Sequence, residues 1–67
     1  MNNIKTIYIT YSRNSGKKWI LDEVFSSMKE LDKFYFFKRD YIKCENNVFK
    51  RDCGTEFLKI IKQEIQL

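Results

Sequence analysis

The side chains best suited to chemistry are four cations near the start of the chain: Lys5, Arg13, Lys17 and Lys18. No Asp or Glu occurs in residues 1–21, although the sequence holds 13 Lys and Arg and 9 Asp and Glu in all. The whole net charge of +4 therefore belongs to the first third of the chain. Such a localised positive field attracts polyanions or acidic protein surfaces over roughly a Debye length, about 8–10 Å.

Three of these cations, Arg13, Lys17 and Lys18, lie in a polar turn over Ser12–Lys18. This grouping favours contact with nucleic acid. Cations at a hairpin tip can bind phosphates, and an Arg can also reach a base edge. Neighbouring aromatic side chains can stack on an unpaired base. The predicted nucleic-acid-binding residues are Arg13, Lys17, Lys18, Tyr8 and Trp19, with Tyr11 as another stacking candidate. The alternative is an ordinary solvated basic loop.

Catalytic chemistry has little support in this sequence. The chain has no His, which is the commonest general base near neutral pH. Asp22 and Glu23 are adjacent, so in a strand they point to opposite faces and cannot share a substrate. No phosphate-binding loop and no metal-ligand spacing is present. We therefore expect a protein that is not an enzyme, with no catalytic residues, no bound metal and no cofactor.

The two cysteines, Cys44 and Cys53, match neither a C-x-x-C redox motif nor a four-ligand zinc site. We expect both to be free, small and partly buried. The alternative is a disulfide across a hairpin, which requires Cα atoms within about 7 Å.

Length and composition predict a single domain over residues 1–67. The longest uncharged stretch, residues 6–12, is far shorter than the roughly 20 apolar residues of a membrane span, and no signal-peptide pattern is present. These features predict a cytoplasmic protein without membrane contact. The abundance of Lys, Asn, Ile, Tyr and Phe is typical of an AT-rich genome, such as that of a low-GC bacterium or its phages.

The basic turn must be positioned by a hairpin. Residues 4–11 alternate as in a strand, with Ile7, Ile9 and Tyr11 predicted on the inner face and Thr6, Tyr8 and Thr10 facing outward. Residues 19–25 would form the second strand, after the loop that contains Gly16. A helix from Lys17 through Leu31 is the competing interpretation.

Two helices and a second hairpin are expected to follow. Ser27 and Glu30 have the spacing of a capping box, which predicts a helix over residues 27–37. Residues 41–51 suit a short hairpin with Asn residues in its turn. The last helix would begin at Asp52 or Thr55, and its apolar positions are Phe57, Leu58, Ile61 and Ile65. The predicted fold is α+β, a small antiparallel sheet packed by two helices in the order β-β-α-β-β-α.

Surplus aromatic side chains suggest a second kind of surface. Residues 34–37 are four consecutive aromatics, and neither a helix nor a strand can point all four to one side. Exposed aromatics often anchor protein interfaces. The predicted interface residues, which would bind a partner or form a homodimer, are Tyr35, Phe36, Phe37, Tyr41 and Phe49. The alternative places all of them in the core.

The segment from the hairpin into the first helix resembles one known family. Phe25, Ser27, Glu30, Leu31 and Phe34 fill the aromatic, cap, acidic, apolar and aromatic positions found there. In this order the segment resembles the arm-binding domains of tyrosine recombinases and related AP2-like DNA-binding domains. The resemblance, over about residues 4–36, implies a sheet lying in the major groove with outward strand residues that read DNA. That family usually has three strands before the helix, whereas two fit here.

Two functions of different classes follow from these patterns. The first is a non-enzymatic basic binding module that acts on nucleic acid or a nucleoprotein complex, as a phage or mobile-element accessory protein. The second is a phage-encoded inhibitor, of the anti-CRISPR or anti-restriction type, that contacts a host defence protein. The salt dependence of binding separates them, because phosphate contacts make affinity fall steeply with salt.

Overall fold

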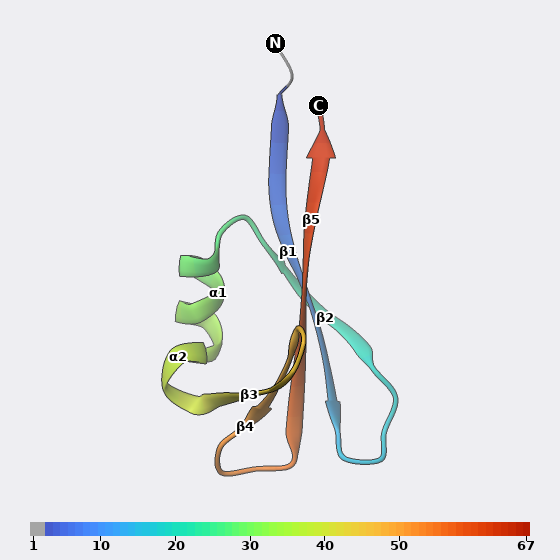
Figure 1. Ribbon diagram of the computed structural model, residues 1–67, viewed down its shortest axis with the longest axis vertical. Helices are drawn as coiled ribbons and strands as arrows, with labels where there is room; N and C mark the ends of the chain where they lie inside the picture. The colour runs from blue at the N-terminus through green and yellow to red at the C-terminus, as the bar shows by residue number, and fades with distance from the viewer. Residues whose placement is uncertain (1–2) are drawn as a thin grey trace.

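The computed structural model describes residues 3–67, which form one antiparallel sheet and two short helices (Figure 1). Along the chain these elements are β1 (Ile4–Asn14), β2 (Ile20–Phe25), α1 (Met28–Tyr35), α2 (Phe37–Asp40), β3 (Tyr41–Glu45), β4 (Val48–Arg51) and β5 (Glu56–Gln66). The spatial order of the strands is β2-β1-β5-β4-β3. The α+β class, both hairpins and the first helix are confirmed, whereas the order β-β-α-β-β-α is wrong.

The predicted C-terminal helix is a strand. Every residue of β1 has a partner in β5, from Ile4 opposite Gln66 to Asn14 opposite Glu56. The apolar offsets of residues 57–65 fit a helix, but their three isoleucines are β-branched and suit a strand equally well. The long-range pairing with β1 decides between the two, because it satisfies one backbone edge of β5 along its whole length.

The sheet buries the opposite face of β1 from the one predicted. Residues directly opposite each other in the β1–β5 register share a face, and successive residues alternate. Thr10 and Ile60 are opposite each other and buried, so even-numbered side chains of both strands face the helices. We call the other side the open face; it carries the odd-numbered residues Lys5, Ile7, Ile9, Tyr11, Arg13, Phe57, Lys59, Ile61, Gln63 and Ile65.

The core is small and lies between the covered face and α1. Its buried members are Phe25, Leu31, Leu58 and Ile60, and Leu31 of α1 is fully enclosed. One of the two hydrogen bonds of the predicted capping box is present at α1: the Ser27 hydroxyl accepts from the Glu30 N–H at 3.2 Å. The Glu30 carboxylate accepts from the Ser26 hydroxyl at 3.0 Å instead of reaching back to the Ser27 N–H.

A polar network centred on the buried Thr10 joins the sheet to α1. The β1–β2 register shifts at Asp22, and there the Thr10 hydroxyl accepts from the Glu23 N–H at 3.1 Å and lies 2.9 Å from the Glu23 carbonyl. The Tyr35 hydroxyl lies 2.8 Å from that of Thr10 and donates to the Asp22 carboxylate. The network thus satisfies backbone groups at the bulge and fixes the last turn of α1 over β1.

We expect Thr10→Val, which keeps the shape and removes the hydroxyl, to lower the free energy of unfolding by about 1–3 kcal/mol. Thr10 is fully buried, and the change removes the hydroxyl that accepts from the Glu23 N–H. Thr6→Val, at a half-buried position of the same strand, is the control and should change stability by no more than about 0.5 kcal/mol. Urea unfolding followed by circular dichroism measures both. Equal effects would show that the network adds nothing.

Ile60 and Ile61 test the strand assignment directly, because they are adjacent and identical but face opposite sides of the sheet. Ile60→Ala should cost roughly 2–5 kcal/mol, the range for truncating a buried aliphatic side chain. Ile61→Ala, on the open face, should cost clearly less. The helical interpretation predicts the reverse order, so a larger loss for Ile61→Ala in the same unfolding assay would contradict the strand.

Candidate nucleic-acid interface

The basic turn lies at one end of the sheet, beside the loop that connects β4 to β5. Its glycine, Gly16, has a φ of +79°, a conformation that side-chain-bearing residues rarely adopt. The Lys17 N–H donates to the Asn14 carbonyl at 2.9 Å, and the Ser15 N–H donates to the Thr55 carbonyl at 3.1 Å. These bonds hold Lys17 and Lys18 exposed at a defined place beside the ends of the two central strands.

Next to this turn, the open face carries a compact group of half-buried side chains that we call the aromatic–cation cluster: Tyr11, Arg13, Trp19, Phe57 and Lys59. The Arg13 guanidinium carbon lies 4.9 Å from the centre of the Trp19 ring and 4.6 Å from that of Phe57. The Lys59 ammonium lies 4.6 Å from the Trp19 ring centre and 5.6 Å from that of Tyr11. Cations and aromatic faces therefore alternate across the cluster, as cation–π attraction favours.

The β1–β5 register assembles this cluster. It places Tyr11 opposite Lys59 and Arg13 opposite Phe57, so that each pair joins one aromatic and one cation across the strands. Trp19, from the turn before β2, contacts both cations. A shift of the register by one residue would send the β5 members to the covered face.

The open face is also free of acid along the two central strands. β1 contains no Asp or Glu, and Glu56 and Glu64 of β5 occupy even-numbered positions on the covered side. The open side of the same strands carries Lys5, Arg13 and Lys59. Along these two strands the open side is therefore more positive than the covered side, where Lys62 accompanies the two glutamates.

Beside the cluster is a shallow cavity of about 470 Å³ at the turn end of the sheet. Its walls include all three cations predicted for phosphate contact, together with Ser12, Asn14, Ile20 and Glu56. The Glu56 carboxylate is 3.2 Å from an Arg51 guanidinium nitrogen, which offsets part of its charge. Its three cations suit the cavity to an anionic group. Arg13 connects the cavity to the cluster, because it belongs to both.

The structure brings together four of the five predicted nucleic-acid-binding residues, Arg13, Lys17, Lys18 and Trp19. Tyr8 is the exception, because it packs against the core on the covered face. The prediction that Tyr8 faces outward is wrong. Phe57 and Lys59 belong to the cluster but were missed in the sequence. Their side chains reach the cluster because residues 56–66 form a strand and not a helix.

The predicted protein-interface residues do not form one exposed surface. Tyr35, Phe37, Tyr41 and Phe49 are half-buried against the core, and the Phe37 ring lies 4.6 Å from that of Phe49. Phe36 is the exception, with 55% of its surface exposed. It adopts a left-handed φ of 53° between the two helices, and the Arg39 guanidinium carbon lies 4.4 Å from its ring centre.

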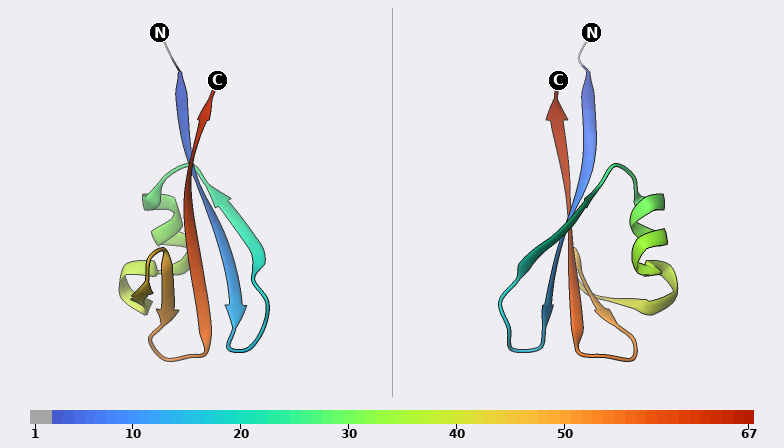
Figure 2. Two further views of the ribbon diagram at one scale, coloured as in Figure 1. Left: turned by 45° about the vertical axis from the view of Figure 1, so that its right-hand side comes forward. Right: turned by 180° about the vertical axis from the view of Figure 1, so that it is seen from behind.

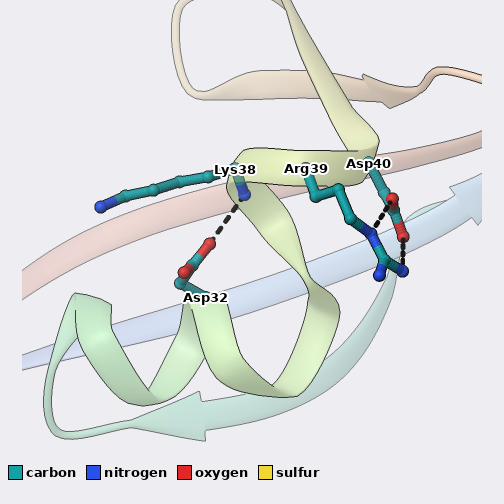
Figure 3. Close-up of polar contacts among 4 residues, drawn as sticks. All are labelled: Asp32, Lys38, Arg39 and Asp40. Carbon is teal, nitrogen blue, oxygen red and sulfur yellow. Dashed lines mark hydrogen bonds and ion pairs between the residues drawn. The ribbon is translucent and has the colours of Figure 1, made fainter.

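Polar contacts define the junction between α1 and α2 (Figure 3). The Asp32 carboxylate of α1 accepts from the Lys38 backbone N–H at 2.7 Å, at the start of α2. Arg39 donates to both carboxylate oxygens of Asp40, at 2.8 and 3.2 Å, and lowers the pKa of that carboxyl. The junction thus holds Phe36 outward, beside a shallow cavity also lined by Lys29, Asp32, Lys33, Lys38 and Arg39.

Other candidate chemistry is sparse. Cys44 and Cys53 are free, as predicted, but both are exposed, so the prediction that they are partly buried is wrong. Among residues 3–67, no group of three or more Cys, Asp or Glu side chains is placed to hold a metal ion. Neither helix in that range is long and apolar enough to cross a membrane.

Burial is the main cause of a raised pKa at Tyr35, and the hydrogen bond to Asp22 adds to it. Burial likewise raises the pKa of Tyr41. Both phenols keep their protons in the folded state at a pH where the unfolded chain has lost them, so folding stability should fall as the pH rises above about 10. Unfolding midpoints measured from neutral to alkaline pH check this. Tyr35→Phe should make the decline shallower, and an unchanged decline would exclude Tyr35 as a source.

Comparison with family models, with curated proteins and with solved structures finds no match for this chain.

Proposed function

We propose that this protein is a non-enzymatic binding module for single-stranded nucleic acid, and that the turn end of its open face is the binding surface. The aromatic–cation cluster is the observation that carries the proposal. Proteins that bind single strands combine aromatic platforms for base stacking with a basic track for the backbone. Both components meet at the turn end of the sheet, where the rings lie on the open face and the cavity reaches around the end of β1, and Arg13 belongs to each.

In this proposal each side chain has a distinct task. Trp19 and Tyr11 offer ring faces to bases, with Phe57 beside them. Lys59 and Arg13 lie over those rings in the free protein and move aside to phosphates as bases stack. The planar guanidinium of Arg13 can also stack on a base itself. Lys17 and Lys18 extend the phosphate track along the turn.

Unpaired bases fit the cluster better than a duplex does, since stacking requires an exposed base face. The resemblance to arm-binding domains favours a duplex instead, with the sheet in the major groove. Direct competition between single-stranded and double-stranded oligonucleotides of one sequence distinguishes these substrates. A nucleoprotein complex with exposed single strands would present the same chemistry, and a phage or mobile-element origin remains part of the proposal.

One observation favours the alternative of a protein-contacting inhibitor of a host defence enzyme. Phe36 is exposed and has a left-handed backbone conformation, which is costly for a side chain with a Cβ and is often associated with function. The surrounding Lys29, Lys33 and Lys38 would favour an acidic partner. The aromatic–cation cluster has no role in this alternative, so we rank it second.

The test compares two triple variants with the same change in net charge. Replacement of Arg13, Lys17 and Lys18 by Ser removes up to three phosphate contacts. The slope of log K against log salt for a single strand should then become shallower by up to about 2, since each contact contributes about 0.7. Replacement of Lys29, Lys33 and Lys38 by Ser, on the helices, should leave the slope within error of wild type. Fluorescence anisotropy of labelled oligonucleotides measures both.

Trp19 separates stacking from charge. Trp19→Ala should weaken binding by about 1–3 kcal/mol, the cost of losing one stacked base, with little change in the salt slope. Because Trp19 is the only tryptophan, its fluorescence in the wild type should also change on binding. Equal losses in the two triple variants would point to non-specific charge attraction. A wild type that binds no oligonucleotide at low salt would overturn the proposed function and favour protein contact.

A further inference from the structure

The outer edge of β5 is unpaired over more than half of the strand. β4 pairs with β5 only from Val48 opposite Lys59 to Lys50 opposite Phe57. The last bond on that side is from the Ile60 N–H to the Asn47 carbonyl, at 2.9 Å. Beyond it, residues 61–66 have β1 on one side and no strand from residues 3–67 on the other. Figures 1 and 2 show this end of β1 and β5 extending past the rest of the molecule.

The backbone phase of this edge, meaning which N–H and C=O groups point outward, follows from the hydrogen bonds at its two ends. The Ile60 N–H points outward, and the Leu67 N–H points inward to the Asn3 carbonyl at 2.8 Å. Along an antiparallel strand successive residues alternate between the two edges. The N–H and C=O groups of Lys62 and Glu64 therefore point outward. An exposed strand edge of this kind is a template for another strand.

We propose that a second copy of this chain pairs with this edge, β5 against β5 in antiparallel orientation, about a two-fold axis at Gln63. In this register Lys62 lies opposite Glu64 of the partner subunit, and Glu64 lies opposite the partner's Lys62. On the open face, Ile61 lies opposite Ile65 of the partner subunit. The contact is isologous, because each pair occurs twice with the roles of the two chains exchanged.

Charge complementarity selects this register over its neighbours. An axis at Lys62 would place the two Lys62 side chains opposite each other, and an axis at Glu64 would do the same for the two carboxylates. Opposite charges stabilise a cross-strand pair, whereas like charges destabilise it. The backbone phase agrees, since Lys62 and Glu64 both point outward and can exchange N–H···O=C bonds as a hydrogen-bonded pair.

The apolar residues of the open face give the dimer a second source of stability. A two-fold axis of this kind is perpendicular to the sheet, so the two sheets become continuous and their open faces lie on the same side. Ile9 of β1 lies directly opposite Ile61 of β5 within one chain, and 40% of the Ile65 surface is exposed in the single chain. Pairing would join these residues with the same residues of the second copy in one apolar strip along the dimer seam.

One consequence rests on the proposed function, although the pairing does not. At about 3.4 Å per residue, Lys59 lies roughly 14 Å along the strand from Gln63. The dimer therefore separates the two aromatic–cation clusters by roughly 27 Å on one continuous face. One extended single strand could cross both clusters, and linking two sites in this way raises overall affinity through effective concentration.

Single charge reversals test the pairing without nucleic acid, by sedimentation from micromolar to millimolar protein. Lys62→Glu and Glu64→Lys each convert two attractive pairs into two like-charge pairs, which should weaken self-association by about tenfold or more. Lys29→Glu, which changes the charge as Lys62→Glu does but at an exposed position on α1, should leave the dissociation constant unchanged. Circular dichroism confirms that each variant is folded.

Two further measurements use the self-complementarity of the register. The double variant Lys62→Glu/Glu64→Lys exchanges the two charges and should restore self-association to the wild-type range. Mixing the Lys62→Glu chain with the Glu64→Lys chain should give a heterodimer, because one edge is then wholly acidic and the other wholly basic. A monomeric wild type throughout the range, or single reversals as strong as wild type, would overturn the proposal. A mixture that remains monomeric would overturn this register.

Discussion

The pairing of β1 with β5 is the constraint on which the rest of this structure depends. It joins the beginning and the end of the described chain over the full length of both strands. Its register decides which side chains face α1 and which face outward, and a slip of one residue would reverse every one of them. The core residues Leu58 and Ile60, and the cluster residues Phe57 and Lys59, therefore owe their opposite environments to the same set of backbone hydrogen bonds.

The second constraint is the small size of the core. Few side chains are fully buried, and one of them, Thr10, is polar. Its hydroxyl connects the bulge in β2 to Tyr35. Hydrogen bonds therefore help to hold α1 on the sheet, where a larger domain would have more apolar contacts. A buried polar network stabilises only when its members are satisfied, and no buried side-chain nitrogen or oxygen in the described part of the chain lacks a partner.

One side of the sheet is closed by the helices, and the other side combines two kinds of surface. Its turn end is aromatic and cationic, whereas its outer end, toward the termini, is rich in isoleucine. The proposed binding of single-stranded nucleic acid uses the turn end. The proposed pairing of two copies uses the β5 edge beside the isoleucine-rich end. The two proposals are compatible because they use different ends of β5. The first follows from the absence of a covering element over the odd-numbered residues of β1 and β5 in the described part of the chain, and the second from the unpaired edge of β5.

Local patterns in the sequence determined the first hairpin, the capped α1, the β3–β4 hairpin and the concentration of charge at the basic turn. These features depend on neighbouring residues: Gly16 in its turn, Ser27 at its cap, and cations close together along the chain. Only the tertiary structure decided that residues 56–66 are a strand and that Thr10, not Ile9, is buried. An apolar pattern with offsets of 3, 4 and 7 fits a helix, and alternation alone does not say which strand face is covered. Pairing between segments some fifty residues apart settles both questions, and it also brings Phe57 and Lys59 to Arg13 and Trp19.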